Sequence, residues 1–72
     1  MSSFPDRLKE LRKVKGITQK AVADNVGLSE TSYQHYERAT REPIMSNISK
    51  LADFFEVSTD YLLGRSDNPN RQ

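Results

Sequence analysis

The stretch TQKAVADNVGLSETSYQHYE, residues 18–37, decides the fold. A threonine or serine that can cap a helix stands at the start of each half, and apolar residues recur at helical spacing. Between the halves lies Gly27, which can take the positive φ that a tight turn between helices requires. The small side chain of Ala23 lets the two helices cross closely. The stretch therefore predicts a helix-turn-helix unit.

Further helices are predicted on both sides of this unit. Ser3 and Gly16 have the residue types that begin and end a first helix, and a polar loop with a proline precedes a fourth helix over residues 45–55. Either residue of the pair Ser58-Thr59 can cap a short fifth helix. No segment alternates apolar and polar residues as a half-buried strand does. The fold class is therefore all-α, a compact bundle of about five short helices.

Two of these helices carry apolar stripes that are expected to face the core. Most successive members of each stripe lie three or four residues apart, which places them on one side of a helix. The stripes are Phe4, Leu8, Leu11 and Val14 or Lys15 in the first helix, and Met45, Ile48, Leu51, Ala52 and Phe55 in the fourth.

The composition excludes several classes of protein. The chain has 72 residues, which allows one domain, and it contains no cysteine and one histidine. Disulfides are therefore excluded, and neither a zinc site nor another cofactor is expected. Since there is no Gly-rich phosphate loop either, we expect no enzyme activity and no small-molecule ligand. The N-terminus lacks an apolar run of signal-peptide or membrane length, so we expect a cytoplasmic protein without a membrane partner.

Charge is distributed unevenly along the chain, although the net charge is only +1. Residues 1–20 contain six basic and two acidic residues, a balance of +4, whereas residues 21–72 contain five basic and eight acidic residues, a balance of −3. Solvated helix faces explain this asymmetry as well as a nucleic-acid partner does. The charge pattern alone therefore leaves the partner open.

A series of short motifs extends from Arg7 to Gly64. They are a basic first helix before Gly16, TQ and LS at the starts of the second and third helices, YE at the end of the third, REP before the fourth, and VSTDYLLG at the end. In this order they strongly resemble the lambda-repressor-like, or XRE-type, helix-turn-helix family of phage repressors and Cro proteins. Members of that family bind operator DNA, usually as two-fold dimers, with the third helix in the major groove. The resemblance implies a sequence-specific transcription regulator whose partner is double-stranded operator DNA.

Two positions depart from the usual sequence of that family. Tyr33 stands where isoleucine or valine is usual, and its hydroxyl group needs a polar partner. We expect the body of Tyr33 to lie in the core and its hydroxyl to reach the DNA backbone. Ala39 stands where glycine is usual, so the loop after the third helix is expected to take a different path.

The polar side of the third helix is the predicted base-reading surface. When Tyr33 faces the core, a rotation of about 100° per residue turns the polar residues of this helix outward. The resemblance assigns base reading to Glu30, Thr31 and His35, and Gln34 has the amide chemistry that pairs with adenine. A solvated polar face is the alternative interpretation. Glu30 has a further alternative role, as a favourable charge at a helix N-terminus.

Contacts with DNA phosphates are expected from residues around this helix. The resemblance implies a phosphate contact for the glutamine at the start of the second helix, and basic side chains neutralise phosphates without reading sequence. Arg41, in the loop, is the candidate for a narrow minor groove. The predicted backbone contacts are Gln19, Lys20, Tyr33, Arg38, Thr40 and Arg41.

One pair of charged residues is expected to have a structural role. In members of the family the residues that match Arg12 and Glu37 form a largely buried ion pair between the first and third helices. The resemblance implies the same pair here, which would hold the reading helix in place.

The resemblance implies that the fourth and fifth helices form the surface of a homodimer. Phe55 belongs to the core stripe, so the neighbouring Phe54 points about 100° away from it. The predicted dimer residues are Phe54, Tyr61 and Leu63, and half-burial within the monomer is the alternative for Phe54. An alternative function is a modulator that keeps this fold but binds a partner repressor. The small net charge and the acidic Glu30 on the reading surface favour that alternative.

The end of the chain differs from the rest in composition. The segment RSDNPNRQ, residues 65–72, has no apolar residue and is expected to be a flexible tail or the start of a linker. Residues 1–64 are then expected to form the helix-turn-helix DNA-binding domain.

Overall fold

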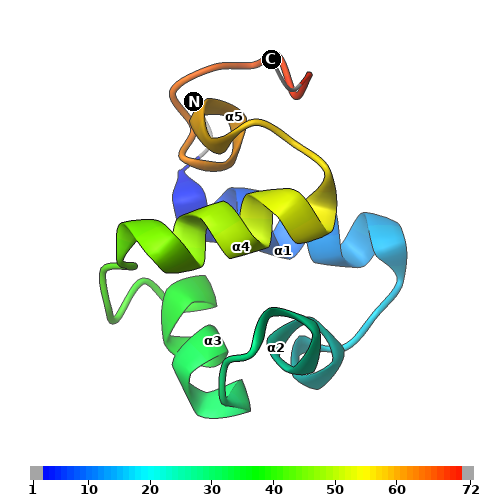
Figure 1. Ribbon diagram of the computed structural model, residues 1–72, viewed down its shortest axis with the longest axis vertical. Coiled ribbons are helices and arrows are strands. Elements are labelled where there is room, and N and C mark those ends of the chain that lie inside the picture. Colours follow the sequence, from blue (N-terminus) through cyan, green and yellow to red (C-terminus); the bar gives the residue numbers. More distant parts are fainter. Residues whose placement is uncertain (1–2, 71–72) are drawn as a thin grey trace.

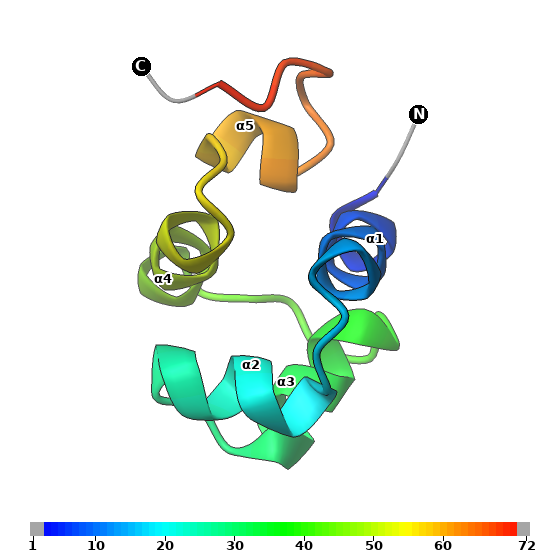
Figure 2. The ribbon, with the colours of Figure 1, turned by 90° about the vertical axis from the view of Figure 1, so that its right-hand side faces the viewer.

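A computed structural model describes residues 3–70; residues 1–2 of the predicted domain and 71–72 of the predicted tail lie outside this range. The described residues form five helices and no strand: α1 (Phe4–Lys15), α2 (Gln19–Val26), α3 (Glu30–Glu37), α4 (Met45–Phe55) and α5 (Thr59–Leu62). Figure 1 shows α2 and α3 at one end of the molecule and α5 at the other. Figure 2 looks along α1 and α4 and shows them as opposite sides of the bundle. The predicted all-α fold is confirmed.

Hydroxyl side chains begin four of the five described helices. Each accepts a hydrogen bond from a backbone amide in the first turn, which would otherwise lack a partner. The pairs, donor first, are Asp6 to Ser3 at 3.4 Å, Ala21 to Thr18 at 3.1 Å, Ser32 to Ser29 at 3.1 Å and Tyr61 to Ser58 at 3.0 Å. Of the two candidates for the cap of α5, Ser58 is therefore the one used. The helix α4 begins after Ile44 without a side-chain cap.

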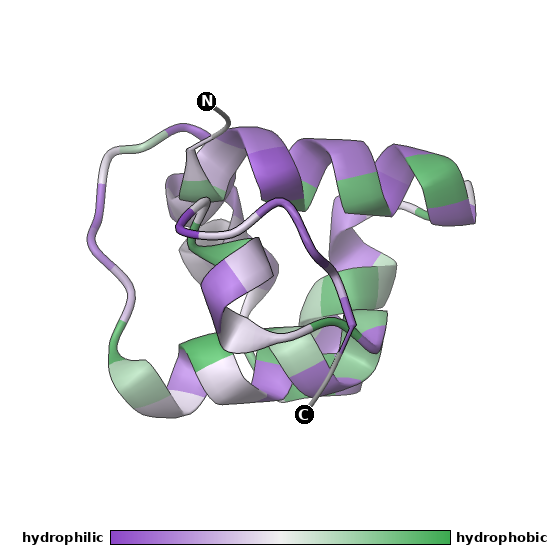
Figure 3. Ribbon diagram, turned by 90° about the horizontal axis from the view of Figure 1, so that it is seen from above, coloured by the Kyte–Doolittle hydropathy of each residue, from purple (hydrophilic) through white to green (hydrophobic). Residues whose placement is uncertain are grey.

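The core lies between α1 and α4 and extends to the inner sides of the other helices. Figure 3 shows hydrophobic and hydrophilic residues alternating along the helices, as expected where one side of each faces the interior. The buried apolar residues are Phe4, Leu8, Val22, Ala23, Val26, Tyr33, Tyr36, Ile48, Leu51, Ala52, Phe55, Val57 and Leu62.

Two members of the predicted stripes lie outside this core. Val14 is 81% exposed and Met45 is 67% exposed. The other candidate for the end of the α1 stripe, Lys15, is also exposed, and its ammonium group lies 5.3 Å from the centre of the Phe54 ring. Met45 is the first residue of α4 and directly follows the loop.

Arg7 is buried although its charge suggested a surface position. Its guanidinium lies 3.8 Å from the centre of the Tyr61 ring in α5 and makes a 2.9 Å ion pair with Asp67. The amide of Ser58 also donates to the carbonyl of Pro69 at 3.0 Å. The described part of the expected tail therefore folds back over α5 and contacts α1.

A strained residue ends α4 and provides a test of the fold. Glu56 has a φ of 58°, and its amide donates to the carbonyls of Ala52 and Asp53. A β-carbon makes this left-handed conformation costly, by about 1–2 kcal/mol, whereas glycine loses about 0.5–1 kcal/mol in chain entropy. We expect Glu56→Gly to raise the free energy of unfolding by about 0.5–1 kcal/mol over Glu56→Ala, which removes the carboxylate but keeps the β-carbon.

Thermal and urea unfolding followed by circular dichroism would measure this difference. The expected gain corresponds to a rise in Tm of about 2–8 °C for a domain of this size. Equal stability of the glycine and alanine variants would show that position 56 is not strained.

Candidate nucleic-acid interface

Gly27 sets the angle between α2 and α3. Its φ of 74° lies in the left-handed region, and the amide of Leu28 donates to the carbonyl of Ala23 at 2.9 Å. Ser29 follows at once and caps α3. Ala23 is fully buried, as expected where two helices cross closely. The stretch that predicted a helix-turn-helix therefore forms one.

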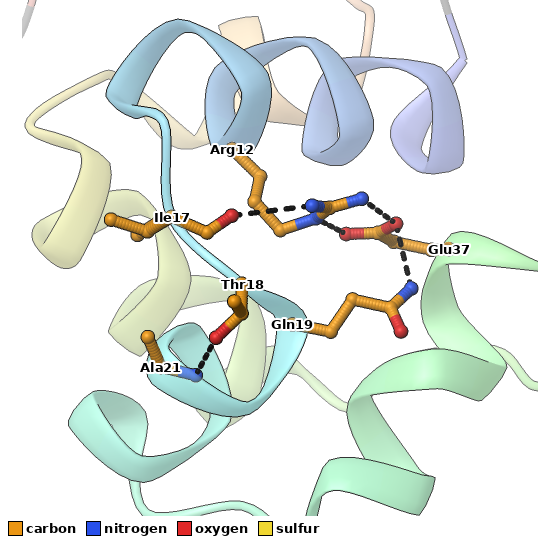
Figure 4. A network of polar contacts seen from close by, with 6 residues as sticks. All are labelled: Arg12, Ile17, Thr18, Gln19, Ala21 and Glu37. Carbon is orange, nitrogen blue, oxygen red and sulfur yellow. Dashed lines mark hydrogen bonds and ion pairs between the residues drawn. The ribbon is translucent and has the colours of Figure 1, made fainter.

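The carboxylate of Glu37 joins α3 to α1 and α2 (Figure 4). Its Oε2 accepts from Nε of Arg12 at 2.7 Å, and its Oε1 accepts from Nη2 of Arg12 at 3.1 Å. Oε1 also accepts from Nε2 of Gln19 at 3.1 Å, and Nη1 of Arg12 donates to the carbonyl of Ile17 at 3.2 Å. The side chain of Glu37 is only 3% exposed. The two ion-pair residues expected from the resemblance are thus in contact, and Gln19 is a third member of the cluster.

Opposing effects act on the pKa of Glu37. Burial acts to raise it, but hydrogen bonds from Arg12 and Gln19 and the positive charge of Arg12 outweigh burial and hold the pKa below its ordinary value. The pKa of Arg12 is raised, chiefly by its hydrogen bond to Glu37. Both groups are therefore charged in the folded protein at neutral pH.

Tyr33 does not reach the surface. Its side chain is completely buried, so the prediction that its hydroxyl contacts the DNA backbone is wrong. The hydroxyl has no hydrogen bond of standard geometry within residues 3–70, and it lies close enough to Glu37 and Arg12 for them to act on its pKa. Burial, followed by the effect of Glu37, raises the pKa of Tyr33. The predicted core position of the ring is correct.

The predicted base-reading residues lie together on α3. Glu30 and Thr31, in its first turn, are exposed, and Gln34 and His35, one turn further on, are partly exposed. The negative charge of Glu30 is close enough to Lys20 of α2 to raise the pKa of that lysine slightly, after the larger effects of Asp24. The structure therefore brings these side chains to one surface.

The loop after α3 keeps a glycine-like path although it has no glycine. Ala39 has a φ of 60°, the left-handed backbone conformation that glycine adopts without steric cost. The amide of Thr40 donates to the carbonyl of His35 at 3.0 Å, and that of Ala39 donates to Tyr36 at 3.4 Å. These two bonds are the pattern that ends many helices with a left-handed residue, here one with a β-carbon.

Several predicted phosphate contacts already have partners within the protein. Gln19 donates to Glu37, and the ammonium of Lys20 makes an exposed 2.9 Å ion pair with Asp24, which raises the pKa of Lys20. An amide nitrogen has two hydrogens and an ammonium has three, so both residues retain donors for a phosphate. Arg38, Thr40 and Arg41 are exposed in the cap and loop that follow α3.

The predicted dimer residues are half-buried within the monomer. The Phe54 ring packs edge-on against Phe55 with 5.0 Å between centroids, and Lys15 partly covers it. Tyr61 lies under Arg7, and Leu63 packs against the core. Phe54 is therefore half-buried within the monomer, and part of its ring stays exposed.

The sequence reasoning missed two features of the structure, one exposed and one buried. Ile44 is 62% exposed and adjoins the exposed Met45, so an apolar patch follows the loop. Met45 was expected to face the core because its spacing fits the apolar stripe of α4, so its exposure was not predicted. The buried Arg7 was also missed, and its position three residues after Phe4 on the inner side of α1 is the signal that could have revealed it.

Comparison with known proteins identifies the class. A family model described as Helix-turn-helix matches residues 8–62, and the chain belongs to this family. The relatives include the Bacillus subtilis HTH-type transcriptional regulator ImmR, 40% identical over 90% of this chain and 51% of ImmR. Another is the Vibrio cholerae CTXphi transcriptional repressor RstR, 45% identical over 83% of this chain and 54% of RstR. The chain spans about half the length of these relatives.

Solved structures have the same fold. The P22 c2 repressor in complex with a synthetic operator aligns with a TM-score of 0.84 and 30% identity, over 92% of this chain and 100% of that chain. The restriction-modification controller protein C.AhdI from Aeromonas hydrophila aligns with a TM-score of 0.78 and 36% identity, over 82% of this chain and 89% of that chain. Both likenesses agree with a helix-turn-helix at α2 and α3.

Other kinds of site find no support in the described residues. Between residues 3 and 70, no group of three or more histidine or acidic side chains is arranged to hold a metal ion. No helix in that part of the chain is long and apolar enough to cross a membrane.

The lowered pKa of Glu37 predicts a pH-dependent stability. Because the folded-state pKa is below the unfolded value of about 4.5, the charged pair contributes its full stability above that value and loses it as the pH falls through the folded pKa. We expect Glu37→Gln to cost about 3 kcal/mol at neutral pH, since it leaves Arg12 without its charged partner. The cost should shrink in acid.

Urea unfolding of the wild type and Glu37→Gln at neutral and at acidic pH would measure this. Glu10→Gln, which changes an exposed glutamate of α1, is the matched control. A destabilisation by Glu37→Gln that stays constant with pH would contradict a stabilising charge on Glu37.

Proposed function

We propose that this chain is the operator-binding part of a transcription regulator and that α3 enters the major groove of double-stranded DNA. The observation that carries the proposal is the contrast between the two sides of α3. Its inner side is fixed to α1 and α2 through Glu37, while Glu30, Thr31 and Gln34 face outward. Specific base contacts need a helix held within about 0.5 Å, and this arrangement supplies such a support.

The comparisons support a DNA partner. The P22 c2 repressor, whose structure includes a synthetic operator, aligns over its whole length with this chain. Curated relatives are transcriptional regulators or repressors by name. An enzyme function has no such support.

We assign base reading to Glu30, Thr31, Gln34 and His35. A carboxylate can accept from cytosine N4, a threonine can meet a base edge or a thymine methyl group, and a side-chain amide can pair with adenine. These four residues span the exposed side of α3. Their chemistry provides direct contacts to more than one base pair in each half-site.

Phosphate contacts are assigned to the residues on either side of the reading helix. Lys20, Arg38 and Arg41 supply positive charge, and Gln19 has a second N–H available after its bond to Glu37. Arg41, exposed in the loop, is assigned to the adjacent minor groove. Thr40 has its single hydroxyl proton directed to the carbonyl of His35, so a phosphate contact would replace that bond.

We propose a homodimer, because one short helix contacts too few base pairs for high specificity. The proposed contacts are the partly exposed side chains Phe54, Tyr61 and Leu63. Beside Phe54 lies a hollow of about 450 Å³ with Val26 and Lys50 in its lining, which could receive a side chain from a second copy. Residues 1–64 are then the DNA-binding unit, and the segment after them contacts α1 through the ion pair of Asp67 with Arg7.

A modulator that binds a partner repressor is the second candidate function. The exposed carboxylate of Glu30 at the tip of α3 favours it, because an acid at that place repels phosphates.

Selection of binding sites from random duplex DNA would distinguish the two functions. We expect enrichment of a near-palindrome with half-sites about one helical turn apart. Three cations per protomer displace counterions from the DNA in this proposal, two at phosphates and one in the minor groove, so log affinity should fall with log salt with a slope of about −5 for the dimer. Absence of enrichment together with tight binding to a repressor would favour the modulator.

Substitutions should separate phosphate contacts from base contacts. Arg38→Gln should weaken binding to all sites nearly equally and lower the salt slope by about 2 for the dimer. Gln34→Ala should instead relax preference at one position of each half-site, by about 1–3 kcal/mol, without changing the slope. If Gln34→Ala leaves every position of the selected site unchanged, Gln34 does not read a base.

A further inference from the structure

His35 and Thr40 form a closed pair at the end of α3. Nδ1 of His35 lies 2.8 Å from Oγ1 of Thr40, and Oγ1 of Thr40 lies 3.3 Å from the backbone carbonyl oxygen of His35. The backbone fixes the pair, since the amide of Thr40 also donates to that carbonyl at 3.0 Å. The left-handed turn at Ala39, with a φ of 60°, brings Thr40 back to the helix end. The threonine side chain is thus held against one nitrogen of the imidazole.

The proton count of this pair distinguishes the two neutral forms of the ring. The threonine hydroxyl has one proton and can also accept. If it donates to the carbonyl of His35, its oxygen is free to accept from Nδ1–H, and both short contacts are hydrogen bonds. If it donates to Nδ1 instead, the 3.3 Å contact becomes one between two oxygens without a proton between them. The first arrangement satisfies more groups, so it is favoured.

We propose that Thr40 holds neutral His35 as the Nδ1–H tautomer, so that Nε2 meets the DNA as a hydrogen-bond acceptor and selects a base with an amino group. This inference rests on the proposed function for its second half only, because the tautomer is a property of the free protein. No hydrogen bond within residues 3–70 uses Nε2, and His35 is partly exposed. The nitrogen is therefore available to a ligand.

The consequence for base choice follows from the edges of the bases. In the major groove cytosine presents its N4 amino group and adenine its N6 amino group, whereas guanine O6 and thymine O4 are acceptors. An acceptor at Nε2 therefore favours cytosine or adenine, and a donor at Nε2 would favour guanine or thymine. Glu30, which can only accept when ionised, has the same preference. Glu30 and His35 together predict cytosine or adenine at two positions of the major groove that α3 faces.

Nuclear magnetic resonance of the free protein tests the first half. The chain has one histidine, so the ring nitrogen signals need no further assignment. Long-range proton–nitrogen spectra at mildly alkaline pH should show a protonated Nδ1 and an unprotonated Nε2 in the wild type. Thr40→Val should shift the ring toward the Nε2–H form, and Thr40→Ser, which keeps the hydroxyl, should preserve the wild-type form. An Nε2–H ring in the wild type, or no change in Thr40→Val, would overturn the proposal.

Site selection with the same proteins tests the second half. The wild type and Thr40→Ser should prefer amino bases at one position of each half-site, and His35→Ala should lose preference at that position alone. Thr40→Val should move that preference toward guanine or thymine by a factor of about 3–10, the value of one hydrogen bond. A wild-type preference for guanine or thymine there, or the same preference in Thr40→Val, would overturn the base-reading step.

The two experiments fail in different ways. If the wild type selects no DNA sequence, the proposed function and the base-reading step both fall, while the spectra still decide the tautomer. If a palindrome is selected but His35→Ala leaves it unaltered, the proposed function stands and the inference about His35 falls.

Discussion

The position of α3 depends on the carboxylate of Glu37. A helix of eight residues is not stable alone in water, so its placement comes from tertiary contacts. The buried rings of Tyr33 and Tyr36 supply apolar burial, which has no preferred direction. The hydrogen bonds from Arg12 and Gln19 supply direction, because they fix the carboxylate relative to two other helices. Since a buried ion pair adds little net stability over an apolar substitute, its contribution here is orientation.

The end of α3 is held by a second set of contacts. Tyr36 packs edge-on against Phe4 with 6.0 Å between ring centroids, and its hydroxyl accepts from the amide of Asn47 in α4 at 2.8 Å. These contacts connect the helices on both sides of the loop. The loop has to turn sharply between α3 and α4 for Tyr36 and Asn47 to meet. The left-handed backbone of Ala39 makes this turn, which accounts for the strain at that residue.

Local signals allowed most of the fold to be predicted from the sequence. The hydroxyl caps and Gly27 are read by residue type alone, because each satisfies a backbone requirement that is independent of the rest of the chain. The contacts that were missed depend on long-range geometry. Burial of Arg7 requires Tyr61 and Asp67, which are distant in sequence. Burial of the Tyr33 hydroxyl depends on how closely α3 packs against α1. The residues of the proposed reading surface could be named from the sequence, but the sequence did not show which of their polar groups already have partners within the protein.

That distinction matters for how the surface would bind. Gln19 and Lys20 are each held by one internal bond, to Glu37 and Asp24, and each retains at least one N–H. A side chain held in this way has already lost part of its rotational freedom, so ordering it against a ligand costs less than ordering a free one. His35 is the extreme case, because its bond to Thr40 fixes both the ring and the chemical character of its outer nitrogen. In the proposed function, internal hydrogen bonds around α3 would therefore act on DNA recognition in two ways, by lowering the entropy cost of binding and by setting which groups are left to bind.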